Sequence, residues 1–182
     1  MVRRSPVEPL LARARDTVSV PGALPGELRF QPKFDDYRAL AFTLWSAPGP
    51  LLVRSRRGSL MQSRFSELVD AAADLPDGLV LDMSLEALLQ RRVVSGGRAA
   101  AGLAQDMPAH FMAFDLLRVD GQELLQVPYG ERRAQLERLF TDRELSARWT
   151  LCQETTDVAT AREWLTSWRQ VPGVGGLLST HE

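Results

Sequence analysis

The sequence contains one cysteine, Cys152, which excludes an intramolecular disulfide and a cysteine-based metal site. The two histidines, His110 and His181, lie far apart in the chain, so neither a zinc site nor a serine triad is expected. The sequence also lacks the Gly-x-x-x-x-Gly-Lys phosphate loop, the Gly-x-Gly-x-x-Gly turn, the His-Glu-x-x-His pair and the Gly-x-Ser-x-Gly elbow. No apolar run approaches the roughly 18 residues of a membrane span, and residues 1–9 have no secretory-signal pattern. We therefore expect a soluble, cytoplasmic protein with no membrane contact.

The remaining composition is that of an ordinary globular protein. Hydrophobic residues make up 45% and charged residues 25% of the 182 positions, which is enough for one domain with its own core. The formal net charge of −1 argues against a protein that holds nucleic acid by bulk electrostatics. Any such contact would use local arginine patches such as Arg54, Arg56 and Arg57, which otherwise form an ordinary solvated face.

Lysine is almost absent, because Lys33 is the one lysine among 22 basic residues. Arginine meets the need for positive charge everywhere else, so that need does not explain Lys33. A lysine amine can lose its proton and attack an electrophile, whereas a guanidinium stays protonated. Lys33 is thus a candidate nucleophile, and the alternative is a solvated surface charge with no special role.

Apolar periodicity and turn residues predict irregularly mixed strands and helices. Strands are expected at residues 28–30, 39–45, 51–55, 78–82, 111–117, 149–152 and 175–178. Helices are expected at residues 65–72, 85–92 and 129–140, and in the segment that follows Thr155 and ends at Trp168. The strands at 39–45 and 51–55 should form an antiparallel hairpin, and residues 93–108 an unpatterned, mobile segment. The predicted class is α+β, with mostly antiparallel sheets flanked by helices.

The residues around the lysine read Gln31-Pro32-Lys33-Phe34-Asp35-Asp36-Tyr37-Arg38. This stretch resembles the nucleotidyl-lysine motif Lys-x-Asp-Gly-x-Arg of ATP-dependent DNA ligases. Lys33, Asp35 and Arg38 match the motif, and Asp36 stands in place of its glycine. Further segments resemble the adenylation domain of the bacterial enzymes, in the family's order: residues 8–12, 54–58, 111–117 with 120–121, 128–137, 155–157 and 173–178. These segments are spread over nearly the whole chain, from about Glu8 to Leu178.

The resemblance implies an ATP-grasp-like adenylation-domain architecture for residues 27–182, incomplete at the C-terminus. Residues 1–26 would be an irregular N-terminal segment of the same domain, and no oligonucleotide-binding (OB-fold) domain is expected. Lys33 would attack the α-phosphate of ATP to give lysyl-AMP, with Mg²⁺ as the implied metal and nicked DNA as the implied partner. Gln31 lies where the family often has an adenine-reading residue, and its amide can both donate and accept.

The resemblance also implies roles for other side chains. Arg38 and Arg56 would donate hydrogen bonds to phosphate or ribose oxygens. Phe114 would stack on adenine, although a core aromatic on a strand is an equally good interpretation. Asp35 and Asp115 could orient Lys33 or bind metal.

Several departures from the family pattern predict that nick sealing is impaired or lost. Asp36 adds a Cβ and a negative charge beside the nucleophile. Met83 and Ser84 follow Asp82 where the family has Asp-Gly-Glu, so the glutamate that contacts ribose and metal is missing. Gly175 stands in place of the glutamate of the Glu-Gly-Val-Val motif, and the chain ends before the family's later lysine motif. Losing one such group can cost about 3 kcal/mol of transition-state stabilisation.

These departures leave more than one function open. The leading hypothesis is an eroded adenylation domain of a ligase for DNA repair or recombination, with slow self-adenylation at Lys33. A second is a non-catalytic module that binds a nucleotide, a DNA end or a protein, and a partner protein could supply the missing motifs. A third is an RNA-capping type nucleotidyltransferase that uses GTP. The segments around Arg54 and Phe114 favour the ligase family over this third class.

Overall fold

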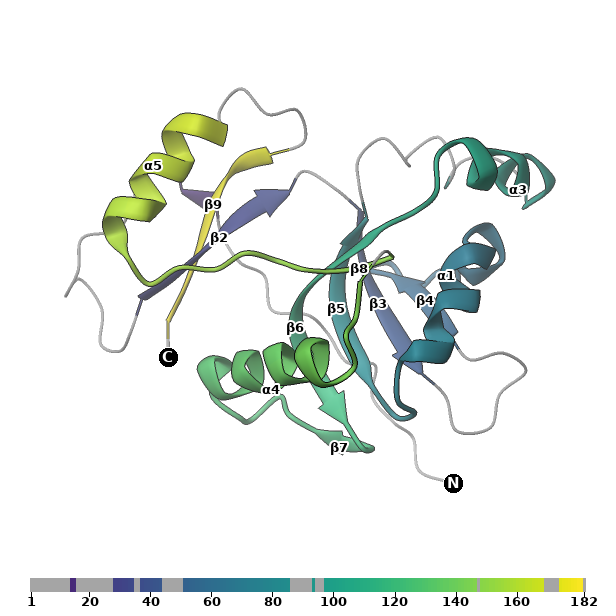
Figure 1. Cartoon of the computed structure of the whole chain (residues 1–182), viewed down its shortest axis with the longest axis horizontal. Helices are drawn as coiled ribbons and strands as arrows, with labels where there is room; N and C mark the ends of the chain where they lie inside the picture. Colours follow the sequence, from purple (N-terminus) through teal and green to yellow (C-terminus); the bar gives the residue numbers. More distant parts are fainter. Residues whose placement is uncertain are drawn as a thin grey trace.

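Two β-sheets organise the chain in the computed structural model, which describes residues 14–15, 28–34, 37–43, 51–85, 93, 97–146, 148–168 and 174–181 (Figure 1). The strands are β1 (Ala14–Arg15), β2 (Leu28–Phe34), β3 (Tyr37–Thr43), β4 (Leu51–Ser55), β5 (Val80–Leu85), β6 (Phe111–Val119), β7 (Gln122–Glu123), β8 (Trp149–Leu151) and β9 (Val174–His181). The helices are α1 (Ser66–Ala71), α3 (Gly97–Asp106), α4 (Tyr129–Asp142) and α5 (Val158–Trp168), with short 3-10 turns at Gln62–Arg64 and Ala72–Asp74.

The larger sheet has the order β4-β3-β5-β6-β7, with β8 paired to β6 off this path, and the smaller has the order β1-β9-β2. The paired strands are antiparallel except β6 and β8, which run parallel. The expected α+β class with mostly antiparallel sheets is confirmed. The predicted hairpin is also confirmed, since β3 and β4 pair with Ala41 opposite Val53.

The two faces of the larger sheet carry different side chains because successive strand residues point to opposite sides. On β3, Ala39 and Ala41 belong to the main hydrophobic cluster, whereas Leu40 belongs to a smaller separate one. Leu68 of α1 and Leu136 of α4 are fully buried in the main cluster. Each such leucine contributes roughly 1.5–3 kcal/mol through burial. The face of β3 that carries Leu40 is also the face that carries Arg38, so the candidate site lies away from the main core.

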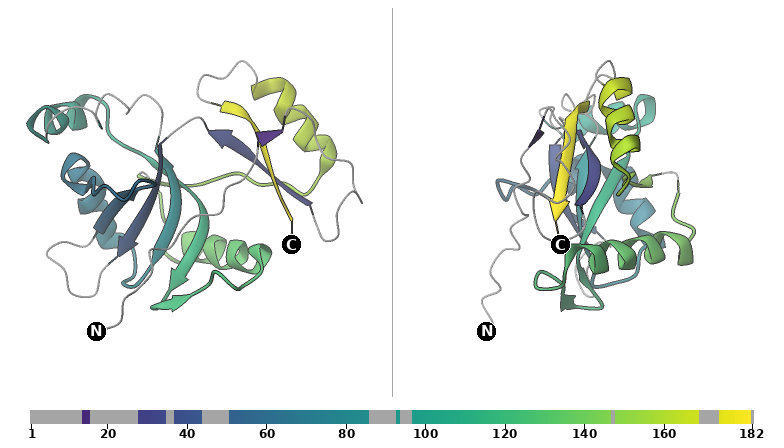
Figure 2. Two further views of the ribbon diagram at one scale, coloured as in Figure 1. Left: turned by 180° about the vertical axis from the view of Figure 1, so that it is seen from behind. Right: turned by 90° about the vertical axis from the view of Figure 1, so that its left-hand side faces the viewer.

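The smaller sheet has its own hydrophobic cluster, which α5 covers (Figure 2). Phe30 of β2, Leu177 of β9 and Ala161 of α5 are buried at its centre. Helix α5 begins after Asp157, whose carboxylate accepts hydrogen bonds from the backbone N–H groups of the first turn. This cap fixes the start of the helix at Val158, three residues after Thr155, which the sequence prediction placed before the helix.

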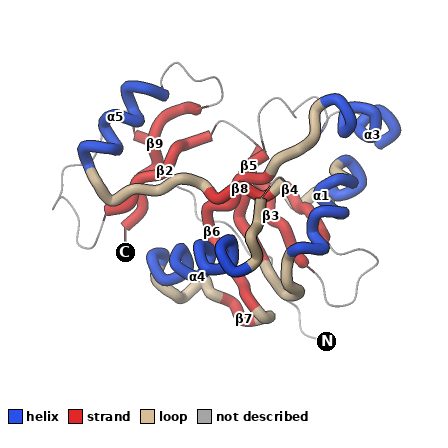
Figure 3. Tube along the Cα trace, in the orientation of Figure 1, coloured by secondary structure: helices blue, strands red, loops and turns tan. Residues whose placement is uncertain are grey.

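The segment between β8 and α5 joins the two sheets, and it is drawn as the loop that runs from one to the other in Figure 3. Within this segment, Thr155 exchanges two backbone hydrogen bonds with Phe30 of β2, at 2.8 and 3.0 Å. The strand that carries the candidate nucleophile is therefore tied directly to the chain leaving the larger sheet.

Two sequence predictions need correction. The segment expected to be unpatterned contains α3 at Gly97–Asp106, where several alanines, the strongest helix formers, outweigh an internal glycine. The two strands around the lysine motif reach into the motif itself and join different sheets, so Lys33 belongs to β2 and Arg38 to β3. The helix predicted at residues 85–92 falls outside the described residues after Leu85, which ends β5.

The other predicted elements are confirmed with shifted ends. Helix α4 extends two residues beyond its predicted end, and β6 likewise extends two residues further to Val119. The predicted turn at Asp120 and Gly121 has positive φ at both positions, 48° and 77°, as a tight hairpin between β6 and β7 requires. Among the described residues, no helix is long and apolar enough to span a bilayer.

Candidate functional site

Lys33 lies near the end of β2, at an irregularity in the pairing with β9. The register shifts between Pro32 and Phe34, so the single residue Lys33 faces two residues of the other strand. Those residues are Gly175 and Gly176, and Gly176 has a φ of 132° that favours glycine. Bulges of this kind re-aim side chains and are common beside active sites. The position where the ligase pattern has a glutamate is thus directly across from the lysine.

The face of β2 that carries Lys33 also carries Arg29 and Gln31, because alternate strand residues share a face. Phe30 points the other way, into the cluster under α5. Arg29 and Gln31 both reach Glu154 in the segment between β8 and α5. Arg29 Nη1 lies 2.8 Å from Oε1, and Gln31 Nε2 lies 2.9 Å from Oε2.

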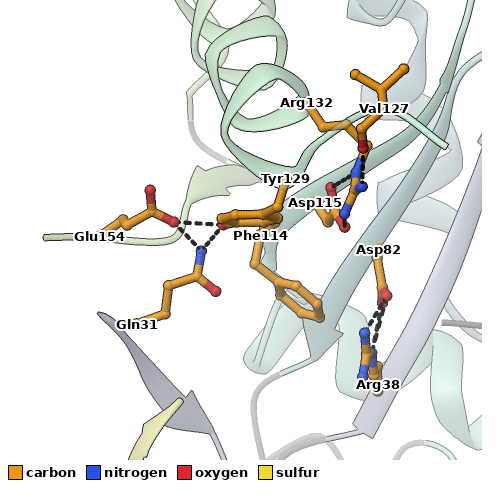
Figure 4. Close-up of polar contacts among 9 residues, drawn as sticks. All are labelled: Gln31, Arg38, Asp82, Phe114, Asp115, Val127, Tyr129, Arg132 and Glu154. Carbon is orange, nitrogen blue, oxygen red and sulfur yellow. Dashed lines mark hydrogen bonds and ion pairs between the residues drawn. The ribbon is translucent and has the colours of Figure 1, made fainter. Parts of the chain in front are cut away.

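Tyr129, the first residue of α4, completes a buried polar network with these residues (Figure 4). Its hydroxyl lies 2.5 Å from Glu154 Oε2 and is hydrogen-bonded to Gln31 Nε2. Burial, together with the charge and hydrogen bond of Glu154, raises the pKa of Tyr129 well above its ordinary value. The hydroxyl therefore keeps its proton, donates it to Glu154 and accepts from Gln31. It also lies 3.4 Å from the backbone carbonyl oxygen of Phe114.

Arg38 forms a bidentate ion pair with Asp82 of β5 beside the Phe114 ring (Figure 4). Arg38 Nε lies 2.9 Å from Oδ1, and Nη2 lies 2.5 Å from Oδ2. Burial raises the pKa of the Asp82 carboxyl, although the hydrogen bonds and charge of Arg38 act in the opposite direction. The Arg38 guanidinium also lies 5.0 Å from the Phe114 ring centroid, which is a cation–π contact.

Phe114 occupies a second irregularity, between β5 and β6. Asp82 is opposite Asp115, whereas Met83 is opposite Ala113, so Phe114 is the extra residue of β6. Its ring is half-buried and lies outside the hydrophobic clusters formed by the described residues. This placement favours a ring available to a ligand over the alternative of a core aromatic.

Asp115 points to α4, where Arg132 binds both of its carboxylate oxygens at 2.9 and 2.7 Å. Arg132 also donates to the backbone carbonyl of Val127 at 2.6 Å and lies over the Tyr129 ring at 5.6 Å. Burial raises the pKa of Asp115, whereas its hydrogen bonds with Arg132 raise the pKa of that guanidinium. Asp115 therefore holds α4 against β6 in this structure.

The structure brings together four of the residues that the sequence singled out. Gln31, Arg38, Phe114 and Asp115 surround the same region (Figure 4). Lys33 follows Gln31 on the same face of β2, because alternate strand residues share a face. Arg56 is exposed on the turn after β4, and Asp35 lies outside the described residues.

Sequence reasoning missed the partners of these groups. Tyr129, Arg132 and Glu154 were not singled out, and Asp82 was noted without its ion pair to Arg38. A buried arginine or glutamine needs an acidic or hydroxyl-bearing partner, and this need is the signal that could have pointed to Tyr129, Arg132 and Glu154. The sequence alone does not show which residues meet.

The described residues do not fit a resident Mg²⁺ ion. No group of three or more His, Cys, Asp or Glu side chains in the described part of the chain could hold a metal. Arg38 binds both carboxylate oxygens of Asp82, and Arg132 binds both of Asp115. Oxygen ligands for a magnesium ion would have to come from elsewhere, such as the phosphates of a nucleotide.

Comparison with known proteins places these features in a family. The model of the ATP dependent DNA ligase domain matches residues 9–175. DNA ligase C2 of Mycolicibacterium smegmatis is 32% identical over 170 residues, which are 87% of this chain and 45% of that protein. DNA ligase C of Mycobacterium tuberculosis is 32% identical over 189 residues, 96% of this chain and 49% of that protein. The chain thus spans about half the length of these relatives.

A solved structure agrees with the sequence comparisons. The ligase domain of M. tuberculosis LigD superposes with a TM-score of 0.63 at 26% identity. The match covers 85% of this chain and 47% of that domain.

Proposed function

The chain belongs to the ATP-dependent DNA ligase domain family, and we propose that Lys33 is its nucleotide-accepting residue. The neutral ε-amine attacks the α-phosphorus of ATP. A P–N bond forms, the P–O bond to the β-phosphate breaks, and pyrophosphate leaves while the amine proton goes to solvent. The product is a lysyl-AMP phosphoramidate.

The observation that carries this proposal is the placement of the chain's single lysine. Lys33 lies at a bulge, on the strand face that carries Gln31, and Gln31 meets Tyr129 beside the Phe114 backbone. Bulges at both Lys33 and Phe114 break the regular pairing of their strands on the two sides of this region. A lysine kept only as a surface charge would need neither this strand position nor these neighbours.

We assign the remaining groups by their positions. Phe114 stacks on the adenine ring, with Arg38 held against it by Asp82. Arg38 contributes positive charge toward the phosphates or ribose. Arg56 and Asp35 are assigned by the family resemblance alone, Arg56 to a phosphate or ribose contact and Asp35, which lies outside the described residues, to orienting the amine. The ion pair with Arg132 makes Asp115 a residue that positions Phe114, its neighbour in the chain, rather than a metal ligand.

The same structure supports slow or absent turnover. Gly175, across from Lys33, provides no carboxylate where the family pattern has glutamate. Ser84, in the place of the other glutamate, lies within β5, is 6% exposed, and is opposite Arg38 on one side and Met112 on the other. Phosphoryl transfer depends on positioning and charge neutralisation, so these two losses act on the step that Lys33 performs.

The later steps of the proposal involve nicked DNA. AMP passes from Lys33 to a DNA 5′-phosphate, and a 3′-hydroxyl then displaces AMP and seals the nick. Relatives that match 60% or more of this chain include proteins named for multifunctional non-homologous end joining, which is consistent with a role in DNA repair or recombination. We propose that sealing by this chain alone is weak, and that a partner protein supplies the missing groups.

A labelling experiment tests the first step. The protein is incubated with α-³²P-ATP or α-³²P-GTP and Mg²⁺, denatured, and examined for label that is stable to alkali and lost in acid, as a phosphoramidate is. Lys33→Arg, which keeps the charge, should abolish the label, and Arg57→Lys should leave the amount unchanged while adding a second lysine as a chemical control. Label from GTP alone would eliminate the ligase assignment.

Restoring the missing groups tests the cause of low activity. Gly175→Glu and Ser84→Glu, combined with Asp36→Gly, should raise the rate of lysyl-AMP formation by at least tenfold over the unmodified chain. Gly175 is not among the glycines with positive φ, so glutamate can be accommodated by its backbone. A rate unchanged by all three substitutions, in a folded protein that binds ATP, would show that the departures do not limit the reaction.

The second candidate is a non-catalytic binding module. Its supporting observation is that Gln31, Arg38 and Asp115 each hydrogen-bond to another side chain of the same chain. Measurable binding of ATP or nicked DNA without any covalent label, in both the natural and restored chains, would favour this function.

A further inference from the structure

The Gln31 amide has a fixed orientation. Its nitrogen carries two hydrogens, and its Nε2 bonds to both Glu154 Oε2 and the Tyr129 hydroxyl oxygen. A flipped amide would place its oxygen against the Glu154 carboxylate, where two acceptors repel each other. Both donors of the amide are therefore in use.

Glu154 and Tyr129 are themselves held in place. The Glu154 carboxylate, which can only accept, also receives Arg29 at 2.8 Å and the Tyr129 hydroxyl at 2.5 Å. The hydroxyl has one proton and gives it to Glu154, so only its lone pairs face Gln31. Neither partner can turn to offer a hydrogen to Gln31 without losing a buried hydrogen bond.

The amide oxygen of Gln31 is available to accept a hydrogen bond from a ligand. None of the hydrogen bonds between described residues uses it, and in Figure 4 it points away from Glu154, on the side where Phe114 lies. A group beside the proposed adenine-stacking ring therefore meets an acceptor, and no donor, from Gln31.

We propose that Tyr129 and Glu154 are positioning residues that set base specificity by locking Gln31 as a pure hydrogen-bond acceptor. This inference rests on the proposed nucleotide site at Lys33 and Phe114. An acceptor at this position pairs with the 6-amino group of adenine and faces the 6-oxo group of guanine or hypoxanthine acceptor to acceptor. A purine with a 6-oxo group then leaves two acceptors unpaired in a largely buried site, which is costly.

ATP and ITP provide a matched test, because they share ribose and triphosphate and differ in the 6-position and the N1 proton. The full chain should bind ATP roughly 10–100 times more tightly than ITP by equilibrium dialysis or calorimetry. Glu154→Gln lets residue 154 donate or accept, and Tyr129→Phe frees one Gln31 hydrogen. Each should bring the two dissociation constants to within about threefold of each other, mainly by improving ITP binding. Glu123→Gln, which alters the exposed Arg118 ion pair at 2.6 Å, is the control and should leave the ratio unchanged.

A second comparison separates positioning from structural support. In a Gln31→Ala background the ratio should already be small, and adding Glu154→Gln should not change it further. If Glu154→Gln and Tyr129→Phe weaken ATP and ITP equally, with the folded circular dichroism spectrum retained, the two residues only stabilise the fold and the inference is wrong. If the natural chain binds ATP and ITP with nearly equal dissociation constants, the inference about Tyr129 and Glu154 is also wrong, whereas the assignment of Lys33 is unaffected. A natural chain that binds neither nucleotide overturns both this inference and the proposed function.

Discussion

Replacing Asp115 by alanine leaves the Arg132 guanidinium without its bidentate partner in a buried position. Arg132 is 4% exposed and Asp115 9% exposed, and the pair forms two hydrogen bonds of 2.9 and 2.7 Å. After the substitution the Val127 carbonyl and the Tyr129 ring are the described groups that still contact the cation. Removing one member of a buried pair costs about 3–5 kcal/mol. We take about 3 kcal/mol for Asp115→Ala, because these two contacts persist.

Urea unfolding measures this loss. A slope of about 2 kcal/mol/M converts the expected change into a fall of roughly 1.5 M in the unfolding midpoint. The matched control is Glu123→Ala, which breaks an ion pair whose carboxylate is 51% exposed and should cost less than about 1 kcal/mol. Replacing both members of the buried pair by apolar residues, Asp115→Leu with Arg132→Met, should recover much of the loss.

An unfolding midpoint for Asp115→Ala that matches that of Glu123→Ala would refute the reasoning. The ion pair would then contribute little to stability, and the Asp115 carboxylate would be available for the metal-binding or lysine-orienting role that the sequence suggests. Loss of lysyl-AMP formation with an unchanged midpoint would favour that role directly.

Further predictions concern stability and reactivity. The pKa of Asp157 is lowered by a hydrogen bond from the Thr160 hydroxyl and, to a smaller extent, by those from the backbone N–H groups of Thr160 and Ala159. The contribution of this cap to stability is therefore fully present above the ordinary aspartate pKa of about 3.9. It is lost as the pH falls through the lowered pKa of the folded state. The melting temperature of Asp157→Ala should therefore lie below that of the natural chain at neutral pH, with the gap closing in acid, and a gap that stays constant would contradict this. Burial raises the pKa of the Cys152 thiol to about 12, and the residue is 1% exposed, so a maleimide should label it only after unfolding. Leu136→Ala should cost about 2–5 kcal/mol in urea unfolding, because the side chain is fully buried in the main core.

The sequence predicts the fold best where local patterns and packing agree. The β3–β4 hairpin, β6, α4 and α5 follow from apolar strand patterns, turn residues and helical periodicity, and each is present within a few residues of its predicted ends. Helix α3 was missed because the glycines in and before it favoured an unpatterned segment, although the rest of the helix is rich in alanine. The assignment of β2 and β3 to different sheets was missed as well, because β2 pairs with β9, far along the chain, whereas β3 pairs with β4 and β5.

In the candidate site too, the residues in local motifs were predicted and the long-range contacts were not. The family pattern identifies Lys33 and Phe114 because each belongs to a short local motif. The polar contacts that fix the site join residues far apart in the chain. The ion pair of Arg38 with Asp82 spans 44 positions, and the hydrogen bond of Gln31 to Glu154 spans 123. No local signal predicts such contacts, since they depend on how the sheets come together. Which hydrogen-bonding group of Gln31 faces the site could not be inferred from the residue type for the same reason.

The pairing of β2 with β9 has a consequence for how the protein folds. The strand that bears the lysine cannot complete its sheet until residues 174–181 have been synthesised, whereas β3, β4, β5 and β6 pair with strands nearby in the chain. Loop closure over such a separation is slow, so the larger sheet should form first and the proposed nucleotide site last. Pulse-labelling hydrogen exchange during refolding should show amides of β5 and β6 protected before those of β2. A chain caught between these stages has a formed core and an exposed, unpaired edge on β2, which makes that edge the point where aggregation or a chaperone contact would begin.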